Sequence, residues 1–448
     1  MADILYRHFN MRRSEILPIL LAALYFFFIL TTLMVLRPTR DALGMESGID
    51  TVRWLFMGTL VLTLFVNPLF GWLVSRFRRL VFISLTHAVF IGCLFAFCAL
   101  LLFAPDVVGR NTGRVFYVWM SVFNLFLTMV FWALMADRFS LEQSKRLFGI
   151  IAVGGTTGAI FGSWIAWTLA EMIGAAMLLL VASACVILAT CAAWALALLQ
   201  PEQAQPQRSP DDPPVVNERA IIGGAAWDGA RAVLRSPYLM GIAGYILILA
   251  VIVTFIYFTR LQMVADLGDD TDMRAGVFAQ IDLITQLATL FLQLLVTGHL
   301  IRRLGVPFTL ALLPVTVALG FIGLAIIGSL AALIVFEAVY RAVQRAITRP
   351  ARETLWTVVS REEKYKAKAF IDTFIYRGGD AVGAQTEGLL ARLGMGLYAL
   401  AAVAVPLAVV WGVLGIWLGR RQARLAEEAR VDDVPPGDTD ATAPEAAR

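Results

Sequence analysis

Apolar runs long enough to cross a lipid bilayer recur along nearly the whole of this 448-residue chain. A spanning helix needs about 20 mostly apolar residues, because the bilayer core offers no water to satisfy backbone polar groups. Hydrophobic residues make up 59% of the sequence, against about 45–50% in soluble domains. We therefore predict an all-α membrane protein with twelve transmembrane helices, near residues 15–40, 52–75, 80–103, 114–137, 147–171, 174–199, 238–264, 276–301, 307–327, 329–349, 367–391 and 395–419.

A polar segment divides the predicted helices into two sets of six. The stretch QPEQAQPQRSPDDPPVVNERA is rich in proline, glutamine and aspartate, which is typical of a flexible linker. The predicted organisation is an N-terminal six-helix bundle (1–200), a cytoplasmic linker (201–236), a C-terminal six-helix bundle (237–420) and a disordered cytoplasmic tail (421–448). Lysine and arginine in the short loops fall on one side of this layout, so both termini are predicted to be cytoplasmic.

Charged residues lie inside four of the predicted spans, the first, fourth, seventh and tenth. A lone arginine at the centre of a spanning helix costs about 2.5–3.5 kcal/mol, so these groups are expected to avoid lipid. In the tenth span Glu337, Arg341 and Arg345 recur every four residues and share one helix face. A row of guanidinium groups suits phosphate or carboxylate, because each group offers a planar fork of donors and keeps its charge.

We therefore predict an anion-binding site in the membrane. The predicted binding residues are Arg37, Arg40, Asp137, Arg260, Glu337, Arg341, Arg345 and Arg377. The predicted coupling or gating residues are Asp41, Asp137, Glu337 and Asp380. The alternative is structural: Glu337 pairs with Arg341, and Asp41 pairs with Arg37 or Arg40, as salt bridges that gate a cavity.

Glycines in the fifth span invite comparison with a phosphate-binding loop. The segment GGTTGAIFGS places Gly154, Gly158 and Gly162 four residues apart, but neither a Gly-Lys-Ser/Thr ending nor a preceding strand accompanies it. A ridge of small residues that allows close helix packing is the better interpretation.

The two halves resemble each other in sequence. The first and seventh spans, YFFFILTTLMVLRPTR and YILILAVIVTFIYFTR, each carry a tyrosine fifteen residues before an arginine. The loops GWLVSRFRR and GHLIRRLG share a Gly-x-Leu-x-x-Arg pattern, and Gly pairs open the fifth and eleventh spans. This duplicated six-helix unit resembles the major facilitator superfamily. The resemblance implies that the first, fourth, seventh and tenth helices line a central cavity.

Three stretches resemble the bacterial and plastid ATP/ADP translocases: LRPTRDAL (36–43), FWALMADRFSLEQSKRLFGIIAVGG (131–155) and KAKAFIDTFIYRGGDAVGA (366–384). The resemblance places that family's basic residue of the first span at Arg40 and its acidic or amide position at Asp137. Its acidic residue of the seventh span falls on Tyr257. The resemblance implies a transporter of a nucleotide or another phosphorylated or carboxylated anion in the bacterial inner membrane.

Other classes of function fit the sequence less well. The chain has three histidines and no His/Asp/Cys grouping, so we expect no enzyme, no metal site and no cofactor. Its net charge of +4 is spread over short loops, which does not indicate nucleic-acid binding. The leading hypothesis is a monomeric secondary transporter, most simply an anion exchanger. A proton-coupled exporter of a small molecule or drug is the alternative.

Overall fold

The computed structural model describes residues 13–76, 79–139, 141–199, 226–295 and 297–432, and these residues form helices with no strand among them. The first six predicted spans correspond to α2 (Ile16–Met45), α3 (Ile49–Arg76), α4 (Arg79–Phe103), α5 (Pro105–Arg138), α6 (Leu141–Ile173) and α7 (Ala175–Leu198). The second six correspond to α9 (Pro237–Ala265), α10 (Thr271–Leu295), α11 (Thr297–Ile327), α12 (Leu330–Val343), α15 (Tyr376–Arg392) and α16 (Leu397–Asp432). Within the described part of the chain, nine helices are long and apolar enough to cross a membrane.

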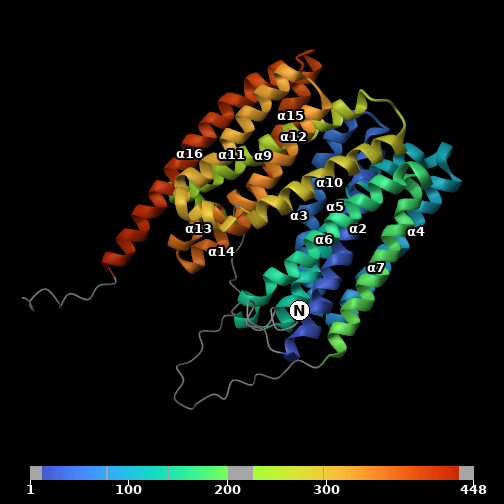
Figure 1. Ribbon diagram of the computed structural model, residues 1–448, viewed down its shortest axis with the longest axis horizontal. Coiled ribbons are helices and arrows are strands. Elements are labelled where there is room, and N and C mark those ends of the chain that lie inside the picture. Colours follow the sequence, from blue (N-terminus) through green and yellow to red (C-terminus); the bar gives the residue numbers. More distant parts are fainter. Residues whose placement is uncertain (1–12, 77–78, 140, 200–225, 296, 433–448) are drawn as a thin grey trace, which may run out of the picture.

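The helices form two groups that follow the order of the chain. Figure 1 shows α2–α7, in blue to green, on one side, and α9, α11, α12, α15 and α16, in yellow-green to red, on the other. The helix α10 lies between the groups and packs on α2 and α6 as well as on α12. Buried apolar side chains accordingly fall into two clusters, one centred on each group. The fold is that of two six-helix bundles in contact.

Glycines bring equivalent pairs of helices close together in both halves. In the first half, a β-carbon on Gly154 or Gly162 of α6 would lie 2.5 Å from a backbone oxygen of α2. In the second half, a β-carbon on Gly379 or Gly383 of α15 would lie 2.9–3.0 Å from a backbone oxygen of α9. The helix-packing interpretation of the glycine-rich segment is therefore correct, and it extends to the matching glycines of the eleventh span.

Two predicted segments contain more helix than expected. Residues 226–235 of the predicted linker form α8 (Ala226–Arg235), which packs against α14 (Arg361–Phe370). The tail predicted to be disordered from residue 421 begins as helix, since α16 continues to Asp432. The segment RRQARLAEEAR consists almost entirely of strong helix formers, which explains the extension. The remainder of the linker and of the tail lies outside the described residues.

Two helices predicted to be continuous contain π-helical turns. The turn η2 (Gln344–Thr348) follows α12, and the turn η4 (Ile371–Ile375) joins α14 to α15. Such turns are rare and occur frequently at functional sites. Apolar periodicity does not reveal them, because a single widened turn leaves the overall pattern helical.

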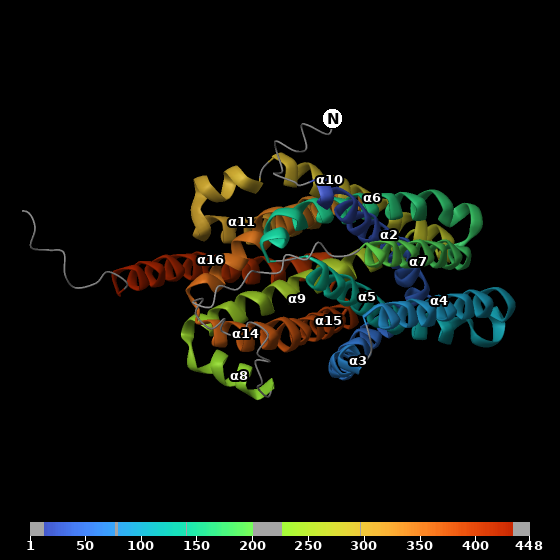
Figure 2. The same cartoon turned by 90° about the horizontal axis from the view of Figure 1, so that it is seen from below.

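The two ends of the molecule differ in their connections. The linker end is where α2 begins, α7 ends and the short helices α8, α13 (Arg349–Thr354) and α14 lie (Figures 1 and 2). The far end carries the α2–α3, α9–α10 and α15–α16 loops. This distinction decides on which side the cavity described below is open.

Candidate functional site

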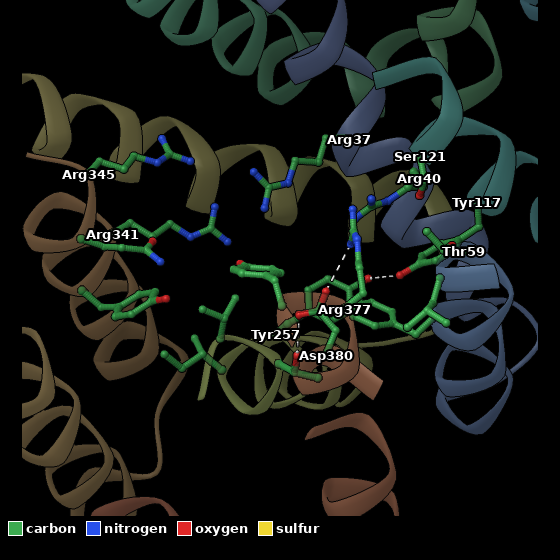
Figure 3. Close-up of a pocket in the computed structure, with 18 residues that line it drawn as sticks. Arg37, Arg40, Thr59, Tyr117, Ser121, Tyr257, Arg341, Arg345, Arg377 and Asp380 are labelled. Atoms are coloured by element: carbon green, nitrogen blue, oxygen red, sulfur yellow. Dashed lines mark hydrogen bonds and ion pairs between the residues drawn. The ribbon is translucent and has the colours of Figure 1, made fainter. Parts of the chain in front are cut away.

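A cavity of about 270 Å³ lies between the two groups of helices and is lined mainly by polar side chains. Its lining includes five arginines, drawn in Figure 3: Arg37 and Arg40 from α2, Arg341 from α12, Arg345 from η2 and Arg377 from α15. Asp380 is the one carboxylate among the described lining residues. Cationic side chains from both halves therefore face one chamber.

The π-helical turns border this cavity. Arg345 lies within η2, and Tyr376 and Arg377 directly follow η4. All three side chains line the cavity. The irregular backbone thus occurs where the second half presents its polar side chains to the chamber.

Tyrosines form much of the remaining wall, namely Tyr117, Tyr257, Tyr340 and Tyr376. The hydroxyls of Tyr117 and Tyr257 lie 2.9 Å apart, and the Tyr257 hydroxyl donates to Asp41 Oδ1 at 3.0 Å. The guanidinium of Arg40 lies over the Tyr117 ring, 4.8 Å from its centroid. The wall therefore offers both donors and aromatic surface to a bound molecule.

Arg260 does not line the cavity. Its side chain is fully buried and lies among three carboxylates, at 2.6 Å from Asp41, 3.1 Å from Asp282 and 3.5 Å from Glu337. We call these four residues the buried hub. A guanidinium removed from water needs such partners, because burial of an unpaired charge is strongly unfavourable.

The carboxylates of the buried hub also support arginines of the cavity wall. Asp41 pairs with Arg40 at 2.6 Å, and Glu337 forms an ion pair with Arg341. Asp282 lies 3.5 Å from Arg341 and 3.7 Å from Arg37. Each carboxylate is therefore shared between Arg260 behind the wall and an arginine that faces the cavity.

The remaining two wall arginines have different partners. Arg377 pairs with Asp380 at 3.2 Å. Arg345 donates to the amide oxygen of Gln286 at 2.6 Å, and no described carboxylate lies within ion-pair distance of it. Across the cavity wall and the buried hub, six arginines stand against four carboxylates, namely Asp41, Asp282, Glu337 and Asp380. The described side chains therefore carry an excess of two positive charges.

The far end is closed by polar contacts between the halves. Arg53 of α3 forms an ion pair with Glu387 of α15 at 2.8 Å. Gln262 of α9, in the same half as Glu387, also donates to that carboxylate. Thr271 of α10 donates to Glu46 at 2.9 Å. Toward the linker end the cavity adjoins a second one, lined among others by Arg345, Arg349 and Arg352. The chamber is therefore closed at the far end and continues toward the linker end.

The sequence matches the family model described as Major Facilitator Superfamily over residues 19–344. The chain belongs to this superfamily. It is thus a multi-pass membrane transport protein and not an enzyme, with a small molecule as its substrate. No curated protein matches the sequence.

Solved structures of other transporters share the fold. A point mutant of the nucleoside transporter NupG is similar with a TM-score of 0.65 and 12% identity, covering 90% of this chain and 99% of NupG. A bacterial homologue of the human lysosomal transporter Spinster, described as inward-facing and unoccupied, gives a TM-score of 0.55 at 14% identity, covering 95% and 100% of the two chains. An auto-inhibited peptide transporter of the POT family gives a TM-score of 0.58 at 15% identity, covering 92% of this chain and 97% of the transporter. At such identities the likeness concerns the fold alone.

The superfamily fold brings most of the predicted site residues together. Arg37, Arg40, Arg341, Arg345 and Arg377 line the cavity, and so does Asp380. Arg260, Glu337 and Asp41 lie in the buried hub and not in the cavity wall. Glu337 pairs with Arg341 and Asp41 pairs with Arg40, which are ion pairs of the alternative interpretation. Asp137 lies in the last turn of α5, and its side chain is outside the described part of the structure.

Sequence reasoning missed two groups of residues that border the cavity or contact its arginines. Asp282 and Gln286 of α10 contact Arg260 and Arg345 from a helix that was not among the four expected to line the cavity. Their signal in the sequence is an acid and an amide four residues apart in an apolar span. The cavity tyrosines other than Tyr257 were also missed, because tyrosine is common in membrane helices and carries no charge that would single it out.

Proposed function

We propose that this chain is a secondary transporter of a small organic anion. The observation that supports the proposal is the placement of five arginines from both halves around one cavity that has a single described carboxylate in its wall. Arginines facing a chamber inside the membrane attract anions, and each can bind phosphate or carboxylate with two parallel hydrogen bonds. Arg349 and Arg352 in the adjoining cavity extend the positive surface toward the linker end.

Transport would proceed by alternating access, with the two six-helix halves (1–200 and 237–420) rocking about the anion. The present conformation is closed at the far end through the Arg53–Glu387 ion pair. Opening that end requires this pair, and the contact between Asp41 and Arg260 across the halves, to separate. An anion held by Arg37 and Arg40 on one side and Arg341 and Arg345 on the other would draw the halves together at the linker end.

We propose exchange rather than one-way movement. An empty cavity with two uncompensated positive charges is costly to close away from water, whereas a cavity that holds an anion is not. Reorientation without cargo should therefore be slow, and uptake should depend on an anion bound from the opposite side.

The cargo proposed is a nucleotide or another phosphorylated or carboxylated metabolite. The resemblance to ATP/ADP translocases in three segments supports a nucleotide. The cavity volume of about 270 Å³ lies just below the range of about 300–1,000 Å³ for ligand pockets and favours a small metabolite. We also propose that the protein is a monomer in the bacterial inner membrane. The basic residues in its short loops support a cytoplasmic position of both termini.

The proposal is tested in proteoliposomes that contain the purified chain. Uptake of labelled organic phosphates and carboxylates is measured with and without the same anion inside. We expect uptake only into preloaded vesicles, and its loss in Arg37→Gln. The matched control Arg421→Gln changes an exposed arginine on the extension of α16 and should transport normally. Equal transport by Arg37→Gln and the control would contradict the proposal.

A second candidate, proton-coupled export of a small molecule, rests on one observation: the ion pair between Arg377 and Asp380 faces the cavity, where protonation of the aspartate would release the arginine. Uptake driven by a pH gradient into vesicles without internal substrate would favour it. If that uptake is lost in Asp380→Asn, the exchange mechanism is wrong.

A further inference from the structure

The two excess positive charges of the cavity are located on particular residues. Arg40 and Arg377 have a carboxylate at 2.6 Å and 3.2 Å, and Arg341 forms an ion pair with Glu337. These three arginines are compensated by the protein itself. They remain hydrogen-bond donors, but their charge is largely balanced before any ligand arrives.

Arg37 and Arg345 are compensated less. The carboxylate close to Arg37 is Asp282 at 3.7 Å, and that carboxylate also lies 3.1 Å from Arg260. Arg345 contacts the neutral side chain of Gln286 at 2.6 Å. The guanidinium groups of Arg37 and Arg345 therefore carry the positive charge that the described side chains leave for a ligand to compensate.

These two arginines come from opposite halves of the molecule. Arg37 belongs to α2 in the first half, and Arg345 belongs to η2 in the second. Figure 3 shows both guanidinium groups along the same wall of the cavity, pointing toward each other. A ligand that neutralises both would lie between the halves, in the position from which it can hold them together.

We propose that Arg37 and Arg345 make this site selective for small organic dianions. The inference rests on the proposed function and adds the charge of the cargo to it. A dianion neutralises both arginines, whereas a monoanion leaves one uncompensated guanidinium in a chamber that must close away from water. The chemistry recognised is two negative charges on one small molecule, either on a phosphate monoester or on two carboxylates.

Matched ligand pairs test the charge requirement on the wild-type chain. Succinate is compared with its monoamide, and glycerol phosphate with its methyl diester, so that each pair differs mainly by one charge. At about pH 7.5 the phosphate monoester is largely doubly charged, since its second pKa is about 6. Binding is followed by the thermal shift of the purified chain and transport by counterflow in proteoliposomes.

We expect at least one dianion to bind and exchange about tenfold or more better than its singly charged partner, as expected for a lost charged hydrogen-bonded contact. The pair that shows this difference indicates whether the two charges are recognised on a phosphate monoester or on two carboxylates. Equal activity of dianions and monoanions overturns this inference and leaves anion transport intact. No counterflow with any anion, in vesicles that contain folded chain, overturns the proposed function instead.

A single substitution then tests the residues. In Gln286→Glu a carboxylate replaces the amide beside Arg345 and compensates that arginine within the protein. The change is nearly isosteric, and the new ion pair favours folding of the variant. We expect the preference for dianions to fall about tenfold, so that monoanions bind nearly as well as dianions. The control Gln422→Glu makes the same change on the extension of α16 and should keep the wild-type preference.

The charge and the shape of Arg345 are separated by two further variants. Arg345→Lys keeps the charge and should keep the preference for dianions with weaker binding, because the ammonium lacks the planar fork. Arg345→Gln should lose the preference. An unchanged dianion preference in both Gln286→Glu and Arg345→Gln would show that the selection resides elsewhere.

Discussion

Arg260 and Arg345 are arginines of the same six-helix half, but they have opposite surroundings. Arg260 is fully buried and contacts three carboxylates, whereas Arg345 faces the cavity and contacts a neutral amide. A guanidinium without water must be compensated by the protein, while one that faces a hydrated chamber keeps its charge for a ligand. The comparison teaches that the surroundings of an intramembrane arginine decide whether it supports the fold or binds the cargo.

The largest expected effect tests the structural side of this comparison. In Arg260→Gln the carboxylates of Asp41, Asp282 and Glu337 lose their common partner. Removing one member of a buried ion-pair network costs about 3–5 kcal/mol. We expect a strongly lowered melting temperature and loss of monodisperse protein in detergent, with Arg421→Gln as the unaffected control. Wild-type stability of Arg260→Gln would show that the buried hub contributes little to folding.

The second prediction tests the functional side. Arg345→Gln removes a charge that has no described carboxylate partner, so the stability should change by less than about 1 kcal/mol. Anion exchange should nevertheless fall about tenfold or more, because a charged hydrogen bond to the cargo is lost. Melting curves and counterflow are measured on the same preparation. If Arg345→Gln is as unstable as Arg260→Gln, the distinction between the two arginines is wrong.

The sequence predicted the fold because its strongest signal is lipid compatibility. Apolar runs of sufficient length specify spanning helices almost independently of tertiary contacts. The similarity between YFFFILTTLMVLRPTR and YILILAVIVTFIYFTR indicated a duplicated bundle. The glycine positions of the fifth and eleventh spans also followed from local pattern, since only a small side chain allows such close helix contact.

Which arginines line the cavity and which lie behind its wall could not be predicted in the same way. Arg40 and Arg260 occupy equivalent sequence positions, yet Arg40 lines the cavity and Arg260 lies behind its wall. The carboxylates that surround Arg260 come from three helices, among them Asp282, which contacts it from α10. Spacing along one helix carries no information about such partners. The π-helical turn that contains Arg345 was not predicted either, because the helical periodicity of the sequence continues through a single widened turn.

The third prediction extends the comparison to the closed far end. Arg53 resembles Arg260 in being buried and in pairing with an acid of the other half, here Glu387. Arg260 also pairs with Asp282 and Glu337 of its own half, so the Arg53–Glu387 pair depends more on the conformation and the Arg260 pairs more on the fold. In Arg53→Gln the closed state should lose about 1–3 kcal/mol relative to a state open at the far end. Spin labels at Ser47 and Asp269, in the far-end loops, should report longer distances in the variant, while the melting temperature changes little. An unchanged distance distribution would exclude Arg53 as part of the closure.

The smallest expected effect concerns the border between the buried hub and the cavity. The Tyr257 hydroxyl contacts Asp41 in the hub at 3.0 Å and Tyr117 in the wall at 2.9 Å, so Tyr257→Phe removes a link between the two. Because Asp41 keeps its two arginine partners, the loss should be about 0.5–1.5 kcal/mol in stability. The control Tyr398→Phe alters an exposed ring at the far end. A drop in melting temperature with unchanged affinity for the anion would place Tyr257 with Arg260, and a drop in affinity alone would place it with Arg345.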